Sequence, residues 1–395
     1  MNKIIKYLAF LFLLVDAQIA LSQSTIKFSE SGLNLALNKA KSENKPVFLM
    51  CYTTWCPHCK YMKSEVFIDH VIAEFYNKTF ICVAQDMEKG NCIKLMDSLK
   101  ITSFPTFIYY DPNGTMVYRV EGEFKPAVFV EEGKNALTPK KQLPFLKQQF
   151  EKDVSNSNNC YVYLRALKKG GMDFSSVIKQ YFETQSDKQL LSELNWLIIS
   201  NGVSDINSRE IQFVIGHQKE YSDIISPERV KRKLDYLVKE LLNPLVETTD
   251  TVNYAINRKL ATQIHSYSID SLIFNYDLKL SEQTKNWNAY KKTSLQSTEI
   301  YAWKNHTQLS DIAGVFLKNI NDSPAISQAE RWAQRSLTLD EEYDTYLLCS
   351  RLYQKLNNIP NAIIMAQKAK DLALKFGWEG TESEIILKEL NGLTK

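Results

Sequence analysis

Two cysteines separated by two residues, Cys56 and Cys59, are the residues of this chain best suited to do chemistry. The segment from residue 55 to residue 60 reads WCPHCK, and Pro57 favours the first position of a helix. Two sulfurs at this spacing at a helix start can form and open a disulfide without a large movement of the backbone. The sequence therefore predicts a redox-active dithiol.

The two cysteines are expected to have different roles. Cys56 precedes the helix, where unpaired backbone N–H groups and the positive end of the helix dipole favour a thiolate, so we expect Cys56 to be the nucleophile. Cys59 lies one turn further and is expected to stay protonated until it attacks a mixed disulfide. The neighbours Trp55, Pro57 and His58 are candidates for tuning this site, and a charged His58 would favour the thiolate of Cys56.

A zinc half-site is the alternative interpretation of two cysteines at this spacing. Zinc requires a second pair of cysteines or histidines at ligand spacing. The remaining histidines do not provide this, since they are scattered singly along the chain: His70, His217, His265 and His306. We therefore expect no metal and no cofactor, and we regard only His58 among the histidines as a candidate site residue.

The other cysteines are expected to be mainly structural. Five of the seven cysteines lie between residues 51 and 92, which favours chemistry in one domain over a scaffold of disulfides. Cys51 and Cys82 lie in apolar segments and are predicted to be core residues. Cys92 could pair with Cys82 or act as a secondary redox site, whereas Cys160 and Cys349 lie in predicted helices and should be structural.

The elements around the dithiol alternate between helices and buried strands. Residues 47–52 and 80–84 are continuous apolar runs, typical of strands buried on both faces of a sheet. The turn residues at 111–114 lie between two further strands and predict an antiparallel hairpin. Helices are predicted at 32–42, 57–67, 71–75, 92–99 and 126–137. This order predicts an α/β fold with a mixed sheet covered by helices on both faces.

Residues 25–138 resemble a thioredoxin domain. The segment WCPHCK matches the active-site motif of that family, and residues 103–106, which read SFPT, match the loop whose proline is cis in the family. The resemblance implies that Pro105, which has no N–H, leaves the backbone of Phe104 free to pair with an extended substrate chain beside Cys56. It also implies that Phe104 and Trp55 form apolar walls. Recognition through the backbone tolerates many substrate sequences.

The resemblance leaves the direction of electron flow open. The Pro57-His58 dipeptide is found in oxidising periplasmic Dsb-type members, whereas the surrounding sequence looks more like exported domains that work in reduction relays. Many thioredoxins also carry an aspartate six residues before the first cysteine, paired with a lysine. Here Met50 and Cys82 occupy those places, which leaves the proton acceptor of Cys59 unidentified and favours a more oxidising disulfide.

The chain after residue 139 is expected to be all helical. It is poor in Gly and Pro and carries apolar stripes at helical spacing, which predicts a thioredoxin-like domain at 23–138, a helical domain at 139–320 and a repeat region at 321–395. Residues 325–375 resemble the tetratricopeptide repeat in their alternation of small and aromatic residues. Stacked repeats present an extended surface, so we expect the array to bind another protein. An irregular helical domain remains the alternative for residues 139–320.

Composition and the N-terminus limit the partners and the compartment. The 395 residues include 48 Lys and Arg against 45 Asp and Glu, a formal charge of +3, and the absence of a long basic run argues against nucleic acid as a partner. Lys3 and Lys6, a following apolar run and small residues up to Ser22 are typical of a signal peptide at 1–22. We therefore expect a periplasmic or otherwise exported protein.

These observations favour an exported thiol–disulfide oxidoreductase that exchanges disulfides with protein substrates and with a membrane redox partner. The alternative is a non-catalytic adaptor, in which the helical repeats bind proteins and the thioredoxin-like domain is a platform. Isomerase activity usually needs two active sites facing one substrate, and this chain has one dithiol.

Overall fold

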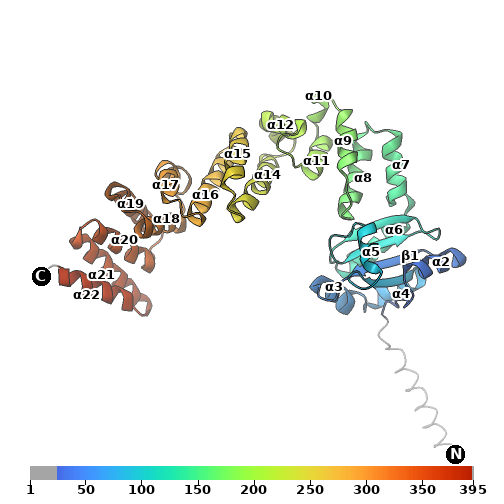
Figure 1. Ribbon diagram of the computed structural model, residues 1–395, viewed down its shortest axis with the longest axis horizontal. Helices are drawn as coiled ribbons and strands as arrows, with labels where there is room; N and C mark the ends of the chain where they lie inside the picture. Colours follow the sequence, from blue (N-terminus) through green and yellow to red (C-terminus); the bar gives the residue numbers. More distant parts are fainter. Residues whose placement is uncertain (1–24, 394–395) are drawn as a thin grey trace, which may run out of the picture. The chain divides into compact units, whose positions relative to one another are not determined.

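The computed structural model describes residues 25–393, and the chain divides into two compact units with the boundary between Ile224 and Ile225. Figure 1 shows a sheet with flanking helices near the N-terminus and helices alone thereafter. The signal peptide predicted at residues 1–22 lies outside the described residues. An α/β domain followed by an all-helical region, as predicted, is confirmed.

The sheet of the first unit has four strands in the order β2-β1-β3-β4. β1 (Val47–Tyr52) is parallel to β2 (Ile81–Asp86) and antiparallel to β3 (Thr106–Tyr110), which pairs in turn with β4 (Met116–Glu121) in antiparallel fashion. The predicted mixed sheet with its hairpin is therefore confirmed. β1, which ends just before the dithiol, is an inner strand and is buried on both faces, as its continuous apolar sequence indicates.

Alternate residues of β1 point into two separate cores, because successive side chains of a strand face opposite sides of the sheet. Phe48 and Met50 belong to one core, and Leu49 and Cys51 belong to the other. The Phe48 face is covered by α3 (Pro57–Tyr61), the π-helical turn η2 (Met62–Val66), α4 (His70–Thr79) and α6 (Pro126–Leu137). The opposite face is covered by α2 (Leu33–Glu43) and α5 (Cys92–Ser98).

The helix predicted over residues 57–67 is not a regular α-helix throughout. Its first part is α-helical and Met62–Val66 forms a π-helical turn. The backbone N–H of Phe124 donates to the Met62 sulfur at 3.3 Å, and Met62 and Val66 are both buried. This turn directs Met62 into the core below the dithiol.

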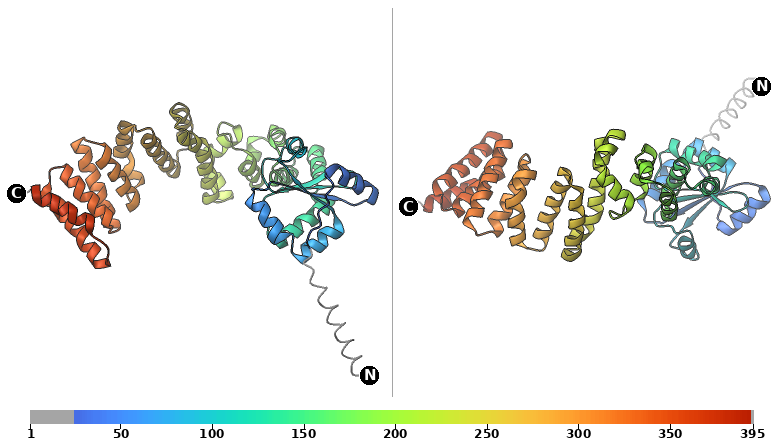
Figure 2. Two further views of the ribbon diagram at one scale, coloured as in Figure 1. Left: turned by 60° about the horizontal axis from the view of Figure 1, so that its bottom comes forward. Right: turned by 90° about the horizontal axis from the view of Figure 1, so that it is seen from above.

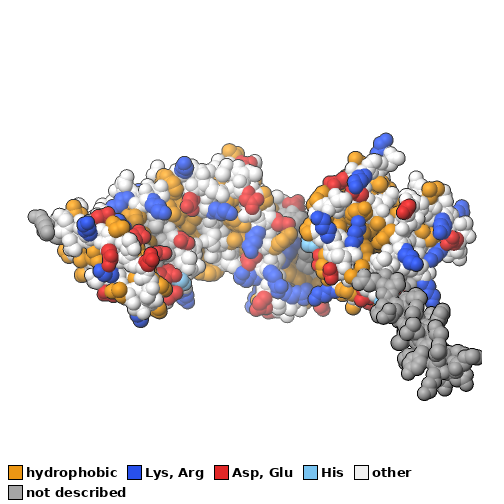
Figure 3. Space-filling view, turned by 90° about the horizontal axis from the view of Figure 1, so that it is seen from below, with side chains coloured by type: hydrophobic (Ala, Val, Ile, Leu, Met, Phe, Trp, Pro, Cys, Tyr) orange, Lys and Arg blue, Asp and Glu red, His pale blue; other side chains and the backbone are white. Residues whose placement is uncertain are grey.

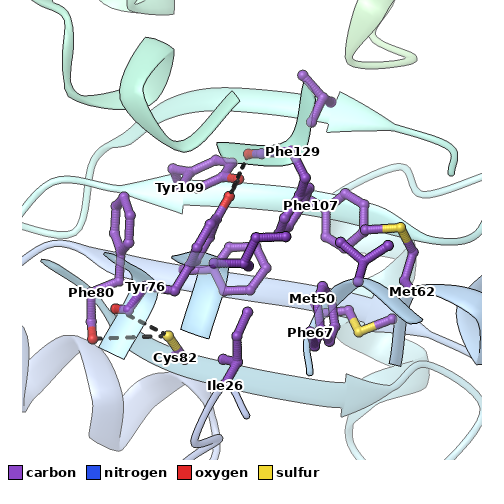
Figure 4. Close-up of a cluster of buried hydrophobic side chains, with 14 of the residues drawn as sticks. Ile26, Met50, Met62, Phe67, Tyr76, Phe80, Cys82, Phe107, Tyr109 and Phe129 are labelled. Atoms are coloured by element: carbon purple, nitrogen blue, oxygen red, sulfur yellow. Dashed lines mark hydrogen bonds between the residues drawn. The ribbon is translucent and has the colours of Figure 1, made fainter. Parts of the chain in front are cut away.

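The core below α3 consists largely of aromatic rings (Figure 4). The Tyr76 ring stacks on Phe129 with 4.9 Å between centroids, and the Tyr76 hydroxyl is 2.8 Å from that of Tyr109. Burial raises the pKa of both tyrosines well above its usual value. Both hydroxyls are therefore neutral hydrogen-bonding groups, and the packed rings support the strand and helix that carry the dithiol.

The first two helices after the sheet pack on its edge strand β4. These are α7 (Leu143–Lys152) and α8 (Ser157–Lys169), which follow a short 3₁₀ turn. Gly170, just after α8, lies so close to β4 that a side-chain carbon at this position would be 2.9 Å from the Arg119 carbonyl oxygen. The first compact unit therefore extends well past the domain boundary predicted at residue 138.

The rest of the first unit is helical. The apolar segment 189–199 is split between two helices, because the Ser192 hydroxyl caps a new helix by accepting from the Asn195 N–H. The helices are α9 (Ser175–Glu183), α10 (Asp187–Leu190), α11 (Glu193–Gly202), α12 (Arg209–Gly216) and α13 (Gln218–Ile224).

The second unit contains α-helices that pack against their neighbours in sequence (Figure 2). Within residues 325–375, the apolar side chains of the 329–337 segment are largely buried, with Trp332 1% exposed. The helices are α14 (Pro227–Glu247), α15 (Thr251–Ala261), α16 (Tyr267–Gln283), α17 (Trp287–Tyr301), α18 (His306–Asn319), α19 (Ser323–Leu339), α20 (Tyr343–Lys355), α21 (Ile359–Phe376) and α22 (Thr381–Leu393). Within residues 25–393, no helix has the length and apolar character needed to cross a bilayer.

Candidate active site

The two cysteines of the WCPHCK segment lie at the start of α3, directly after the turn that follows β1. Cys56 is the N-cap residue, with an extended backbone, and Pro57 is the first helical residue. The backbone N–H of Cys59 donates to the Cys56 sulfur at 3.3 Å. An N–H donor stabilises a thiolate more than a thiol. The geometry thus gives the Cys56 sulfur the kind of donor that a nucleophilic cysteine uses.

Both cysteines are more buried than a position at a helix tip would indicate. Cys56 is 3% exposed and Cys59 is 1% exposed. The Cys56 thiol also donates to the Phe104 carbonyl oxygen at 3.5 Å. The Cys56 sulfur is therefore almost fully enclosed, with the backbone of Phe104 beside it.

The environment of Cys59 keeps its sulfur protonated. Burial raises the pKa of the Cys59 thiol to about 12, with a further contribution from its hydrogen bond to Cys56. A backbone hydrogen bond from Thr53 and the positive charge of Lys63 act in the opposite direction. Lys63 is itself partly buried, with Nζ 3.0 Å from the centroid of the Tyr52 ring, and burial lowers its pKa. A lysine in the turn after α3 is thus the cation that acts on the second cysteine.

An aromatic surface lies next to Cys56. The rings of Trp55 and Phe104 meet edge to face with 6.3 Å between centroids, and the Phe104–Pro105 peptide bond is cis. Trp55 is 62% exposed, and its indole N–H donates to both carboxylate oxygens of Glu88 at 2.9 and 3.0 Å. Glu88 therefore fixes the orientation of an exposed ring beside the dithiol.

His58 is paired with a carboxylate that the sequence analysis missed. Its Nδ1 is 2.9 Å from Glu123 Oε2, and both side chains are exposed. Glu123 lies in the loop between β4 and α6, and no local pattern connects it with a residue 65 positions earlier. Since the Glu123 carboxylate offsets a positive charge on His58, the effect of His58 on Cys56 is weaker than the sequence alone indicates.

Met50 and Cys82 lie in the aromatic core and not at the surface. Met50 is fully buried and Cys82 is 3% exposed. The Cys82 thiol is 3.7 Å from the Tyr76 carbonyl oxygen, and burial raises the pKa of Cys82 to about 12. The two positions that hold an ion pair in many thioredoxins are thus apolar here, in agreement with the sequence analysis.

The remaining cysteines take no part in the dithiol site. Cys82 belongs to the core on one face of the sheet, whereas Cys92 packs against the core on the other face, together with Cys51. The sheet separates Cys82 from Cys92. The disulfide between them that the sequence left open is therefore wrong. Cys160 in α8 and Cys349 in α20 are fully buried, in agreement with a structural role.

One group of potential metal ligands was missed because its members are far apart in sequence. His306, Asp340 and Glu342 come together in the second unit, with the two imidazole nitrogens 3.8 Å from Asp340 and 3.5 Å from Glu342. Each nitrogen faces a different carboxylate, whereas a metal ion binds only one nitrogen of an imidazole. We interpret the group as a polar contact between α18 and the α19–α20 loop. Within the described residues, no such group includes Cys56 or Cys59.

Comparison with known proteins decides the nature of the first domain, because residues 33–137 match the family model of the thioredoxin-like domain. This segment is a thioredoxin-like domain. It is 30% identical over 103 residues to the thiol:disulfide interchange protein DsbD of Vibrio vulnificus, a match that covers 25% of this chain and 17% of DsbD. It is 43% identical over 54 residues to spermatogenesis-associated protein 20 of Mus musculus, covering 14% of this chain and 7% of that protein. The chain thus matches only a small part of these relatives.

The solved structures that are similar to this chain likewise match only part of it. A candidate disulphide-isomerase from Bacteroides thetaiotaomicron is 31% identical, with 29% of this chain and 96% of that chain covered and a TM-score of 0.28. A thioredoxin from Thermus thermophilus is 21% identical, with 30% and 90% covered and a TM-score of 0.27.

Proposed function

We propose that this chain is a thiol–disulfide oxidoreductase that acts on protein disulfides through Cys56 and Cys59. The observation that carries the proposal is the hydrogen bond from the Cys59 backbone N–H to the Cys56 sulfur at a helix start. The thioredoxin-like domain that contains both residues supports the same enzyme class. The dithiol requires neither a metal nor an organic cofactor.

In the reducing direction, the Cys56 thiolate attacks one sulfur of a substrate disulfide. The substrate S–S bond breaks, its other sulfur leaves as a thiolate that takes up a proton, and a mixed disulfide forms at Cys56. Cys59 then loses its proton and attacks the Cys56 sulfur, which releases the second substrate thiol. Two electrons pass to the substrate, and the chain is left with a Cys56–Cys59 disulfide. The oxidising direction is the reverse of these steps.

The aromatic surface beside Cys56 provides the substrate site of this proposal. The exposed Trp55 ring and the Phe104 ring offer apolar contact, and the backbone of Phe104, beside Pro105, can pair with an extended chain. The Phe104 carbonyl must then exchange its contact with the Cys56 thiol for one with the substrate.

We place this activity outside the cytoplasm, on the basis of the signal-peptide pattern at residues 1–22. A membrane redox partner would then supply or accept electrons, which is supported by the similarity to the interchange protein DsbD. The helices after the thioredoxin-like domain, including the region that resembles tetratricopeptide repeats, would bind the client protein.

Insulin reduction in the presence of dithiothreitol tests the proposal. We expect the Cys56→Ser variant to lose the catalysed rate completely, because the nucleophile is gone. The Cys160→Ser variant, altered in α8, is the matched control and should keep the rate of the unmodified chain. Equal rates for the unmodified chain and Cys56→Ser would contradict the proposal and leave only the role of a protein-binding adaptor.

A further inference from the structure

A groove in the first unit lies between strand β4 and helices α7 and α8, outside the dithiol site. It has a volume of about 690 Å³. Three of its residues are buried apolar or aromatic side chains, Tyr118, Leu143 and Leu146, and Tyr161 and the exposed Val162 lie along α8. The groove therefore has an apolar base that can accept an apolar side chain.

The charged residues that line this groove are all basic. Six of the lining residues are Lys or Arg and none is Asp or Glu: Arg119, Lys140, Lys141, Arg165, Lys168 and Lys169. The chain as a whole carries a formal charge of only +3. On the face shown in Figure 3, basic and acidic side chains are intermixed. The groove thus gathers positive charges, whereas over the whole chain the positive and negative charges nearly balance.

Two of these six cations are neutralised by carboxylates. Arg119 pairs with Glu121 at 2.8 Å, and Lys169 pairs with the buried Glu132 at 2.6 Å. Glu132 also accepts a hydrogen bond from the Tyr118 hydroxyl at 2.7 Å. The Lys169–Glu132 pair links α8 to α6 and, through Tyr118, to β4, whereas the Arg119–Glu121 pair lies within β4. Both pairs therefore belong to the structure that holds the groove in shape.

The other four cations have no carboxylate partner within the described part of the chain. The Lys141 ammonium donates to the side chain of Asn135 at 2.6 Å, and that of Lys168 donates to the Asn201 carbonyl oxygen at 2.8 Å. Arg165 lies over the ring of Tyr161, 5.6 Å from its centroid, and Lys140 is exposed at the groove. Four positive charges at the rim of an apolar groove attract an anion that also carries apolar groups.

We propose that this groove binds an acidic polypeptide segment, with an apolar side chain of the segment inserted between β4 and the α7–α8 hairpin. A concave site with cations at its rim suits a chain that offers one apolar side chain flanked by carboxylates. A membrane surface would instead need a flat or convex face from which apolar side chains project. The site belongs to the same compact unit as the dithiol but does not depend on thiol chemistry.

Binding of a synthetic peptide tests the proposal on the full chain. The probe is a fluorescently labelled Glu-Asp-Leu-Phe-Glu-Asp peptide, followed by fluorescence anisotropy at low and high salt. We expect it to bind, to bind more weakly at high salt because charges are screened, and to bind equally well to a Cys56→Ser, Cys59→Ser variant. The peptides Lys-Lys-Leu-Phe-Lys-Lys and Glu-Asp-Ser-Ser-Glu-Asp, which lack the charge or the apolar element, should bind at least about 10-fold more weakly.

Variants at exposed positions locate the site. Lys140→Gln, Lys141→Gln and Lys168→Gln combined should raise the Kd of the acidic peptide at least about 10-fold, and Val162→Asp should raise it by repelling the carboxylates and removing apolar contact. The matched control is Lys147→Gln on α7, whose lysine pairs with Glu151 and does not line the groove.

Three outcomes would overturn the proposal. The first is no binding of the acidic peptide, and the second is an unchanged Kd in the triple variant. The third is tighter, variant-sensitive binding of phosphatidylglycerol vesicles or of a single-stranded oligonucleotide than of the peptide. Because the dithiol variant is expected to bind normally, failure of this proposal is distinguishable from failure of the proposed oxidoreductase activity.

Discussion

The start of α3 and the neighbouring strands β1 and β2 bury their cysteines to the same extent but give the sulfurs different partners. Cys56 and Cys59 are 3% and 1% exposed, and Cys51 and Cys82 are 0% and 3% exposed. At the helix start, a backbone N–H donates to the Cys56 sulfur. Both sulfurs also face a carbonyl oxygen, that of Phe104 for Cys56 and that of Tyr76 for Cys82, so the N–H donor is the difference between them.

This difference shows that exposure alone does not distinguish a redox cysteine from a core cysteine in this domain. A carbonyl oxygen can only accept, so it stabilises the thiol, whereas an N–H group stabilises the thiolate. Helix starts offer unpaired N–H groups, and strand interiors do not, because their N–H groups are used by the sheet. The local backbone therefore decides which buried sulfur can react.

Alkylation of the reduced, folded chain gives the largest expected contrast between the two regions. We expect iodoacetamide to modify Cys56 at least about 10³-fold faster than Cys82, because a core cysteine reacts only when the domain opens. Mass spectrometry of the digested protein measures each site separately. Unfolding in urea is the control, since it should equalise the two rates. Equal rates in the folded chain would show that the helix start gives Cys56 no advantage.

Many thioredoxins have an aspartate and a lysine where this chain has Met50 and Cys82. A carboxylate at position 50 tests whether this core accepts a charge without its partner. We expect Met50→Asp to lower the free energy of unfolding by about 3 kcal/mol at neutral pH, because a fully buried carboxylate there has no cationic partner. Acidification should restore part of this loss, since protonation removes the buried charge. Urea denaturation measures both effects.

The control for this substitution is Met50→Leu, which keeps the apolar volume and should cost less than about 1.5 kcal/mol. Adding Cys82→Lys to Met50→Asp should recover part of the lost stability. Equal stability of Met50→Asp and Met50→Leu would mean that the carboxylate reaches water or a cation.

The pH dependence of the second exchange step gives the smallest effect. Burial raises the pKa of Cys59 to about 12, so its thiolate fraction increases about tenfold per pH unit at any pH well below that value. We therefore expect resolution of a mixed disulfide between Cys56 and thionitrobenzoate to accelerate about tenfold per unit between about pH 7 and pH 9. Release of thionitrobenzoate follows this step, and Cys59→Ser should release none. A flat profile would contradict the assignment of Cys59 as a protonated resolving residue.

Local sequence patterns were sufficient to predict most of the strands and helices of the first domain. The apolar run at 47–52, the turn at 111–114 and the helix start at Pro57 depend on neighbouring residues only, and the strands, hairpin and helix lie where these patterns predict them. In the helical region, apolar stripes do not reveal where one helix ends and the next begins, as at Ser192, whose hydroxyl caps a new helix within the apolar segment 189–199.

Long-range pairs could not be predicted in the same way. Glu123 beside His58, Glu88 beside Trp55 and Lys63 near Cys59 modify the site through side chains from other elements. No spacing rule connects such residues, because the distance between two loops depends on how the intervening elements pack.

The sequence by itself determined a pair of sulfurs at a helix start and the order of strands and helices around it, since both follow from contacts between near neighbours in the chain. The tertiary structure alone decided how deeply Cys56 is buried and which carboxylates face Trp55 and His58. It also decided that α7 and α8 pack on β4 and line a basic groove. The physical reason is that burial and charge at a site depend on residues brought together from distant parts of the chain.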